Sequence, residues 1–253
     1  MQAQVGDYYN NQAKGYIEFS KDNFSWRFIE KPGFDKYISD LYQPDRRILD
    51  IGCGGGRIIS YLIQQGVMPD NIVGIEPSIE LIKYARENLP RETSLITMSL
   101  EELALKQNIF DLVTANMVFH YLDTPSLLTG LDKIYDVLKP EGILSFIDTD
   151  PDHNEESRKP ENLDKWMIQE TPWGTEMPVF NRHPRTLLNL IDYAGFDLQT
   201  GWQLKVEEEG KRFPELYTKY SSRNSRIGGR FVRVSEREKE TRRDPRPIPN
   251  LTR

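Results

Sequence analysis

The stretch from Ile48 to Arg57, which reads Ile-Leu-Asp-Ile-Gly-Cys-Gly-Gly-Gly-Arg, constrains the fold of this chain more than any other feature. Its first four residues predict a short buried strand, and an apolar helical pattern begins at Ile58, directly after the glycines. Gly52 lets the chain leave the strand sharply, and Gly54 lets the backbone approach a ligand without an obstructing Cβ. A strand, a glycine turn and a helix in this order are typical of a nucleotide-binding βα unit, and a tight turn without a ligand is the alternative.

Two further apolar segments place polar residues where such a site would need them. Residues 73–75 predict a second strand that ends at Glu76, which follows Gly52 by 24 residues. A carboxylate that accepts ribose hydroxyls is expected about 20 residues after the glycine turn. Residues 109–115 predict a third buried strand that ends at Asn116. Because open α/β sheets bind ligands at the carboxyl ends of their strands, these groups are expected to share one site.

Helix signals between these strands support an alternating α/β chain. Ser78 is placed as the N-cap of an amphipathic helix that extends to Leu89. Asp123-Thr124-Pro125 predicts the start of another helix, whose apolar residues continue to Leu138. A turn at 139–142 and a buried strand at 143–147 follow, and Asp148-Thr149-Asp150 stands at the carboxyl end of that strand.

Four motifs in this order resemble those of class I S-adenosylmethionine-dependent methyltransferases of the small-molecule type. They are Asp50–Gly56, Glu76, Phe110–Val113 with Asn116, and Leu138–Leu144. The tyrosine-rich segment 8–16 is similar to the N-terminal segment that closes over cofactor and substrate in that family, and the resemblance extends from about Tyr8 to Gly195. It implies a Rossmann-like, mostly parallel seven-stranded sheet with an antiparallel last strand.

The chain of 253 residues is long enough for one domain with additions. We expect residues 1–44 to form a lid and residues 45–235 to form the methyltransferase domain. Within that domain, residues 151–184 interrupt the alternating pattern with five prolines and scattered aromatic residues, which predicts an insertion after the fifth strand that roofs the site. Residues 236–253 are rich in charge and proline and predict a basic, disordered tail.

The resemblance assigns cofactor contacts to particular residues. It implies that Asp50 lies near the amino group of S-adenosylmethionine, that Gly52 and Gly54 pass under its methionine part, and that Glu76 accepts the ribose hydroxyls. The remaining cofactor positions lie in the N-terminal segment, the glycine turn and the ends of the next strands: Tyr16, Cys53, Pro77, Ser99, Leu100, Asn116 and Met117. Ser99 stands where many members carry an aspartate that bonds the adenine amino group, which puts cofactor affinity in doubt.

Methyl transfer from a sulfonium depends chiefly on holding two reactants in line, and a general base is needed only where the nucleophile carries a proton. His120 follows the third buried strand predicted above, where cofactor and substrate would meet, and it is the leading candidate for that base. Asp148 and Asp150 compete for this role, and a packing or substrate-orienting role for His120 is the alternative.

Aromatic and basic residues around the predicted site are candidates for substrate contact: Trp26, Tyr121, Trp173, His183 and Arg185. Arg185 could pair with a substrate carboxylate or form a salt bridge at a helix start. Apolar walls with a few polar groups are typical of small-ligand sites. We therefore expect methylation of an oxygen or nitrogen of a small, partly apolar metabolite or small peptide. The sequence does not decide the substrate or the oligomeric state.

The charge and cysteine content of the chain indicate which kinds of partner and which cellular compartment to expect. The residues from Lys211 onward carry a net charge of +8 and the rest of the chain −14, for a total of −6. An acidic body disfavours nucleic acid as a partner. The single cysteine, Cys53, cannot form an internal disulfide and indicates a reducing compartment. Neither a membrane span nor a signal peptide is expected, nor a metal site, so we expect a cytoplasmic protein.

Two other functions stay open at this point. An NAD(P)-dependent oxidoreductase would also use a glycine turn and Glu76, but the Gly-x-Gly-x-x-Gly pattern requires a glycine where this chain has Arg57. A non-catalytic binding module could retain the fold, although the intact glycines and Glu76 disfavour it.

Overall fold

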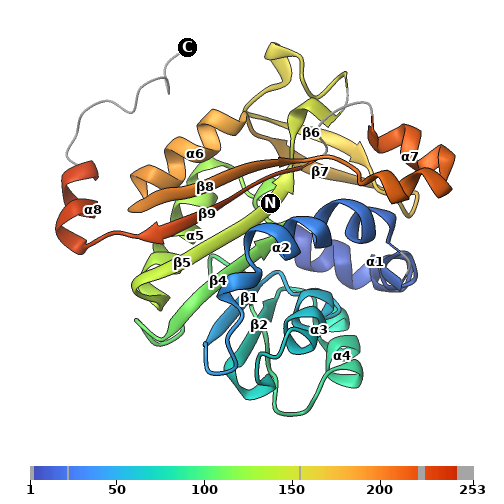
Figure 1. Cartoon of the computed structure of the whole chain (residues 1–253). Helices are drawn as coiled ribbons and strands as arrows, with labels where there is room; N and C mark the ends of the chain where they lie inside the picture. Colours follow the sequence, from blue (N-terminus) through green and yellow to red (C-terminus); the bar gives the residue numbers. More distant parts are fainter. Residues whose placement is uncertain (1–2, 22, 154, 222–225, 244–253) are drawn as a thin grey trace.

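The computed structural model describes residues 3–21, 23–153, 155–221 and 226–243. Its centre is a seven-stranded sheet with the strand order β3-β2-β1-β4-β5-β9-β8 (Figure 1). The strands are β1 (Ile48–Ile51), β2 (Ile72–Glu76), β3 (Ser94–Thr97), β4 (Phe110–Asn116), β5 (Leu138–Thr149), β8 (Phe196–Leu204) and β9 (Arg226–Arg233). The predicted strand at the glycine turn, residues 48–51, is therefore confirmed to the residue.

The sheet reverses its order beside β1. Strand β1 pairs in parallel with β2 on one side and with β4 on the other. Strand β9 is antiparallel to both β5 and β8, so the predicted mostly parallel sheet with an antiparallel last strand is confirmed. A ligand crevice is expected where the strand order reverses, outside the carboxyl ends of β1 and β4.

Helices cover both faces of the sheet (Figure 1). Apolar residues of α5 and α6 form one core cluster with the sheet, and those of α2, α3 and α4 form another. The helices are α1 (Ala3–Lys21), α2 (Lys31–Tyr37), α3 (Arg57–Gln64), α4 (Ile79–Asn88), α5 (Thr124–Val137), α6 (Pro184–Tyr193), α7 (Pro214–Ser221) and α8 (Glu236–Arg243). Among the described residues, no helix combines the length and apolar character needed to cross a bilayer.

The predicted helix caps are present. The Ser78 side chain accepts a hydrogen bond from the Leu81 amide at the start of α4, and Asp123 accepts one from the Ser126 amide at the start of α5. These bonds satisfy backbone donors that the first helical turn leaves free.

Helix α1 lies against α4 at the edge of the site. The Asn10 Oδ1 atom accepts hydrogen bonds from Ser78 Oγ at 2.8 Å and from the Glu80 amide at 3.3 Å. Between β5 and α6 the chain forms a separate hairpin of β6 (Lys165–Glu170) and β7 (Glu176–Asn181). The ring of Trp173, in the turn of this hairpin, lies edge-on to that of Tyr16 on α1, with centroids 5.5 Å apart.

The prediction of disorder is wrong for residues 236–243, which form α8. Its charges are paired with acids of other elements: Arg242 with Asp192 at 3.0 Å and Lys239 with Asp132 at 3.4 Å. The Lys239 ammonium also lies 3.6 Å from the ring centroid of Tyr135. A charged sequence is thus ordered by partners that composition alone could not reveal. Residues 244–253 lie outside the described residues.

Candidate functional site

A cavity opens at the carboxyl ends of β1, β2 and β4, where the strand order reverses. Its empty volume is about 1260 Å³ including the open mouth. Ten of the eleven residues predicted to contact the cofactor line it: Tyr16, Gly52, Cys53, Gly54, Glu76, Pro77, Ser99, Leu100, Asn116 and Met117. Asp50 is the exception, because its side chain is buried in β1 and does not reach the lining.

The glycine turn forms the floor of this cavity. Gly52 and Gly54 have φ values of +64° and +53°, a conformation that L side chains rarely adopt. A Cβ atom on Gly52 would lie 2.7 Å from Cγ2 of Val118, and one on Gly54 would lie 3.1 Å from the Tyr16 hydroxyl. Side chains at these two positions would therefore occupy the space that a ligand needs.

Two buried carboxyl groups lie at this turn. Burial raises the pKa of Asp50 to about 7, even though Thr114 Oγ1 donates a hydrogen bond to its Oδ1 at 2.9 Å. Burial likewise raises the pKa of Glu76 to about 7, against the amides of Ser78 and Gly54, which donate to it at 3.0 and 3.1 Å. The Oδ2 atom of Asp50 has no hydrogen-bond partner among the described residues. Each carboxyl group keeps acceptor capacity for further donors.

The far end of the cavity is lined by the loop after β3. The Ser99 hydroxyl donates to Glu102 Oε2 at 2.9 Å, and the Ser99 amide donates to the same oxygen at 3.1 Å. The hydroxyl oxygen keeps its lone pairs, so Ser99 can still accept a hydrogen bond. After β4, the Oδ1 atom of Asn116 is buried without a partner among the described residues, and Met117 has a φ of +60°.

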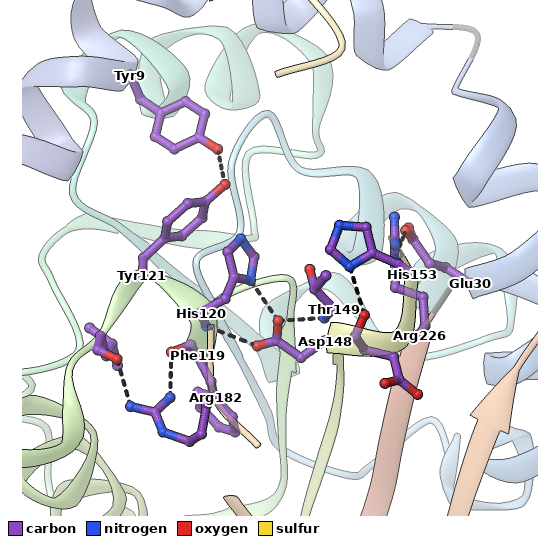
Figure 2. A network of polar contacts seen from close by, with 12 residues as sticks. Tyr9, Glu30, Phe119, His120, Tyr121, Asp148, Thr149, His153, Arg182 and Arg226 are labelled. Atoms are coloured by element: carbon purple, nitrogen blue, oxygen red, sulfur yellow. Dashed lines mark hydrogen bonds and ion pairs between the residues drawn. The ribbon is translucent and has the colours of Figure 1, made fainter. Parts of the chain in front are cut away.

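The structure joins the two predicted catalytic residues. Nδ1 of His120 lies 2.6 Å from Oδ1 of Asp148, and the His120 amide donates to Asp148 Oδ2 at 3.1 Å. Burial alone would raise the pKa of Asp148, but His120 and two backbone amides lower it overall. Figure 2 shows the second ring nitrogen of His120 pointing away from Asp148. The His120 ring lies against that of Tyr121 at an interplanar angle of 52°, with centroids 3.9 Å apart, and Tyr121 rather than His120 lines the cavity.

Asp150, the competing candidate for the base, is held differently. It accepts a hydrogen bond from the Asp152 amide at 3.0 Å, and burial raises its pKa. Neither Asp150 nor the His120–Asp148 pair is part of the cavity lining, and the pair is favoured because the His120 ring lies directly beside Tyr121, which lines the cavity.

Arg182, which the sequence did not indicate, fixes the turn that carries His120. Its Nη1 and Nη2 atoms donate to the carbonyl oxygens of Phe119 and Leu122 at 3.1 and 2.7 Å (Figure 2). Its guanidinium lies 4.6 Å from the ring centroid of Phe180, and burial lowers its pKa to about 10. The end of the hairpin is thereby tied to the predicted catalytic turn.

Aromatic residues from α1, from the turn after β4 and from the hairpin of β6 and β7 cover the cavity and form its roof. The hydroxyls of Tyr9 and Tyr121 are hydrogen-bonded at 2.8 Å (Figure 2). The rings of Tyr9 and Tyr16 meet edge to face, with centroids 5.3 Å apart. Tyr16, Tyr121 and Trp173 were predicted at the site and line the cavity; Tyr9 was missed. The signal for Tyr9 was present in the tyrosine-rich N-terminal segment.

Three predicted substrate residues lie elsewhere. Trp26 packs on Phe34 and Tyr61, and it lines a second hollow behind the glycine turn instead of this cavity. Irregularly spaced aromatics gave no periodicity that could assign its direction. The Nδ1 atom of His183 accepts from the Arg185 amide at 3.0 Å as the N-cap of α6, and Arg185 itself is exposed. His183 therefore acts as a helix cap, and neither residue lines the cavity.

Comparisons with known proteins find relatives for the part of the chain that forms the floor of this cavity. The family model described as "Methyltransferase domain" matches residues 49–146, which contain β1 to β4 and most of β5. An uncharacterized methyltransferase of Synechocystis is 29% identical over 159 residues, which cover 60% of this chain and 68% of that protein. The chain spans between 39% and 68% of the lengths of the curated relatives that head this comparison.

Two solved structures show the same fold. A crystal structure of a putative S-adenosylmethionine-dependent methyltransferase from Listeria monocytogenes aligns with a TM-score of 0.65 at 18% identity, covering 81% of this chain and 99% of that one. The 1,6-didemethyltoxoflavin-N1-methyltransferase of Burkholderia thailandensis, solved with its substrate and S-adenosylhomocysteine, aligns with a TM-score of 0.62 at 14% identity, covering 92% and 88%.

The family match lies on the strands and the glycine turn that form the cavity floor. It also removes the reason for the oxidoreductase and non-catalytic alternatives, since the turn departs from the dinucleotide pattern at Arg57. We conclude that residues 49–146 form a methyltransferase domain, that the fold is similar to that of S-adenosylmethionine-dependent methyltransferases, and that the chain is a methyltransferase with S-adenosylmethionine as its cofactor.

Proposed function

We propose that the chain transfers a methyl group to an oxygen or nitrogen of a small, partly apolar metabolite inside this cavity. The observation that carries the proposal is the cavity floor, where left-handed glycines and a buried carboxylate meet at the strand ends. This donor set fits the cofactor. Glu76 has acceptor capacity for two ribose hydroxyls, and the bare backbone at Gly52 and Gly54 leaves space for the methionine part.

Several residues would hold S-adenosylmethionine. Glu76 would accept the ribose hydroxyls, the Leu100 amide and Ser99 would meet the adenine ring, and Asn116 would face the amino-acid end. Tyr16 lies over Gly54 and would close the floor from above. When bound, the cofactor supplies a methyl group already activated by a sulfonium. The protein therefore has to orient the acceptor in line and exclude water, which can contribute about 7–11 kcal/mol.

A proton must leave when the acceptor is a neutral N–H or O–H group. The His120–Asp148 pair is suited to this step because Asp148 holds Nδ1 of the imidazole at 2.6 Å and leaves the other nitrogen free to take a proton. We propose His120 as the base, reached from the cavity beside Tyr121. Asp148 would orient the ring and stabilise its charged form.

The cavity walls support a small, partly aromatic acceptor. Phe19, Tyr121 and Trp173 offer ring faces and edges, which suit flat apolar groups. The Burkholderia neighbour binds 1,6-didemethyltoxoflavin in the same fold. A small heteroaromatic molecule is therefore a reasonable acceptor for this chain, whereas the acidic body of the chain disfavours nucleic acid.

Calorimetric titration with S-adenosylhomocysteine tests the proposal, with NADH and NADPH as controls. We expect binding to S-adenosylhomocysteine alone, and a loss of about tenfold to hundredfold in affinity in Glu76→Ala. Glu87→Ala, on the exposed side of α4, is the matched control and should leave the affinity unchanged. Equal affinity of Glu76→Ala and the wild type would remove Glu76 from the ribose. A screen of small heteroaromatic acceptors with a labelled methyl donor then tests the transfer itself.

A further inference from the structure

A charged cluster lines the cavity where β9 begins. The Glu30 carboxylate is only 2% exposed, and its Oε1 atom accepts hydrogen bonds from Ser25 Oγ at 2.7 Å and from Arg226 Nε at 3.2 Å. Arg226 is the first residue of β9 and is paired with Thr149 at the carboxyl end of β5. Figure 2 shows Glu30 and Arg226 side by side near His153. Ser25, Glu30 and Arg226, which form this cluster, all line the cavity.

Both hydrogen bonds of this carboxylate go to the same oxygen. The Oε2 atom of Glu30 is buried and has no hydrogen-bond partner among the described residues. Burial would raise the pKa of Glu30, but Arg226 and Arg57 lower it overall, so the group is an ionised acceptor. A buried carboxylate oxygen without a donor is costly, and native sites satisfy such atoms.

The surrounding charges select the kind of donor that fits. Arg226 and Arg57 both act on Glu30, so two guanidinium groups already lie near this carboxylate. A substrate ammonium would add a third positive charge, whereas a neutral N–H or O–H group would satisfy Oε2 without one. The Nε and Nη1 atoms of Arg57, which also lines the cavity, are buried without a partner among the described residues and can donate to a carbonyl oxygen.

We propose that Glu30 Oε2 accepts a hydrogen bond from a neutral N–H or O–H group of an aromatic or heteroaromatic substrate and so orients the ring for methylation. This inference rests on the proposed function and specifies its substrate class: a flat, uncharged molecule with a donor edge. The ring lies between Phe19, Tyr121 and Trp173, and a neighbouring carbonyl of the same ring faces Arg57. Glu30 is a specificity determinant here and takes no proton.

Matched small probes test the inference on the protein saturated with S-adenosylhomocysteine. The probes are 2-pyridone, which has an N–H beside a carbonyl, its 1-methyl derivative, which lacks the N–H, benzylamine as the cation and benzoate as the anion. Their dissociation constants are measured by ligand-observed NMR titration. We expect 2-pyridone to bind at least about tenfold more tightly than each of the other three, a difference of one hydrogen bond to a charged group.

Two variants show whether Glu30 carries the preference. Glu30→Gln should bring 2-pyridone and its 1-methyl derivative within about twofold of each other, with S-adenosylhomocysteine affinity kept; Glu209→Gln, exposed and distant in the chain, should retain the tenfold preference. If Glu30→Gln fails to fold, Glu30→Met with Arg226→Met replaces the whole pair by apolar side chains and should give the same loss.

The outcomes separate the two claims. A wild type that binds S-adenosylhomocysteine but shows no preference for 2-pyridone overturns the inference alone. Tighter binding of benzoate or benzylamine, or a preference that survives both Glu30 variants, does the same. A wild type that fails to bind S-adenosylhomocysteine overturns the proposed function as well.

Discussion

The hydroxyl groups of Tyr9 and Tyr121 lie 2.8 Å apart and form a hydrogen bond between α1 and the turn after β4. Tyr121 follows His120 directly, so this contact links the N-terminal helix to the proposed catalytic turn. Both hydroxyls are buried, and burial raises the pKa of each, which keeps them protonated and able to bond.

Tyr9→Phe should loosen the roof. The change leaves the Tyr121 hydroxyl without its partner and should cost about 1 kcal/mol of unfolding free energy. Because α1 covers the cavity, we expect S-adenosylhomocysteine to dissociate faster with little change in its association rate. Stopped-flow fluorescence measures both rates. Tyr193→Phe on α6 is the control, and an unchanged dissociation rate in Tyr9→Phe would show that the contact does not hold the roof.

His120→Gln and Asp148→Asn should lower turnover more than cofactor affinity. Removing a general base typically costs about 10²–10⁴-fold, while neither side chain lines the cofactor part of the cavity. The amide in Asp148→Asn keeps one acceptor oxygen but places an NH2 donor where the second oxygen accepts, and it carries no charge to stabilise the imidazolium, so the imidazole loses its orientation. The measurements are turnover across pH with an acceptor found in the screen, and S-adenosylhomocysteine calorimetry. A pH profile identical to that of the wild type would assign His120 to packing.

Asp50→Asn should stabilise the cofactor-free protein at high pH. The pKa of Asp50 is raised to about 7 by burial, so the carboxyl contributes its full stability below the unfolded value near 4 and loses it as the pH rises through 7. The variant cannot ionise, and its amide keeps the acceptor for Thr114. Relative to the wild type, we expect a gain of about 1.4 kcal/mol for each pH unit between about 4 and 7, and no further gain above 7.

Urea unfolding at pH 5.5 and pH 8.5 measures this difference. The advantage of the variant should be smaller at pH 5.5, where only the unfolded wild-type carboxyl is ionised, than at pH 8.5, where the folded carboxyl is ionised as well. A variant that is less stable than the wild type at both pH values would mean that the charged form of Asp50 is favoured in the fold.

Arg182→Met should weaken the turn that carries His120. The substitution keeps the apolar contact with Phe180 but leaves the buried carbonyls of Phe119 and Leu122 without donors, a cost of about 2–4 kcal/mol. Turnover should fall while S-adenosylhomocysteine affinity stays within about twofold. Arg185→Met, exposed on the same segment, is the matched control for both readouts. Equal stability of the two variants would exclude the proposed positioning role.

Much of the nucleotide-binding half could be predicted because its signals are local. The strand at residues 48–51 is a short apolar run bounded by glycine, and Ser78 and Asp123 cap helices three residues or fewer from their partners. Ten cofactor positions fell at the cavity since they follow strand ends, which a parallel sheet brings together.

The other residues of the site depend on contacts between distant segments. Glu30 and Arg226 are separated by 196 residues, and Arg182 meets Phe119 over 63 residues. No periodicity or spacing within either segment marks these pairs. Trp26 was placed wrongly because its neighbours, Phe34 and Tyr61, are set by the packing of α2 on α3, and α8 was missed because its charges find acids on other elements.

The contacts between α1 and the hairpin of β6 and β7, which form part of the roof, bear on the rate of ligand release. Tyr8 on α1 is hydrogen-bonded to Thr175 of the hairpin across 167 residues of sequence, and Trp173 packs over Gly15 of the same helix. Because these two segments cover part of the cavity, we expect release of S-adenosylhomocysteine to be slower than the chemical step. The first turnover would then appear as a rapid burst of methylated product. Later turnovers would follow at the slower rate of product release.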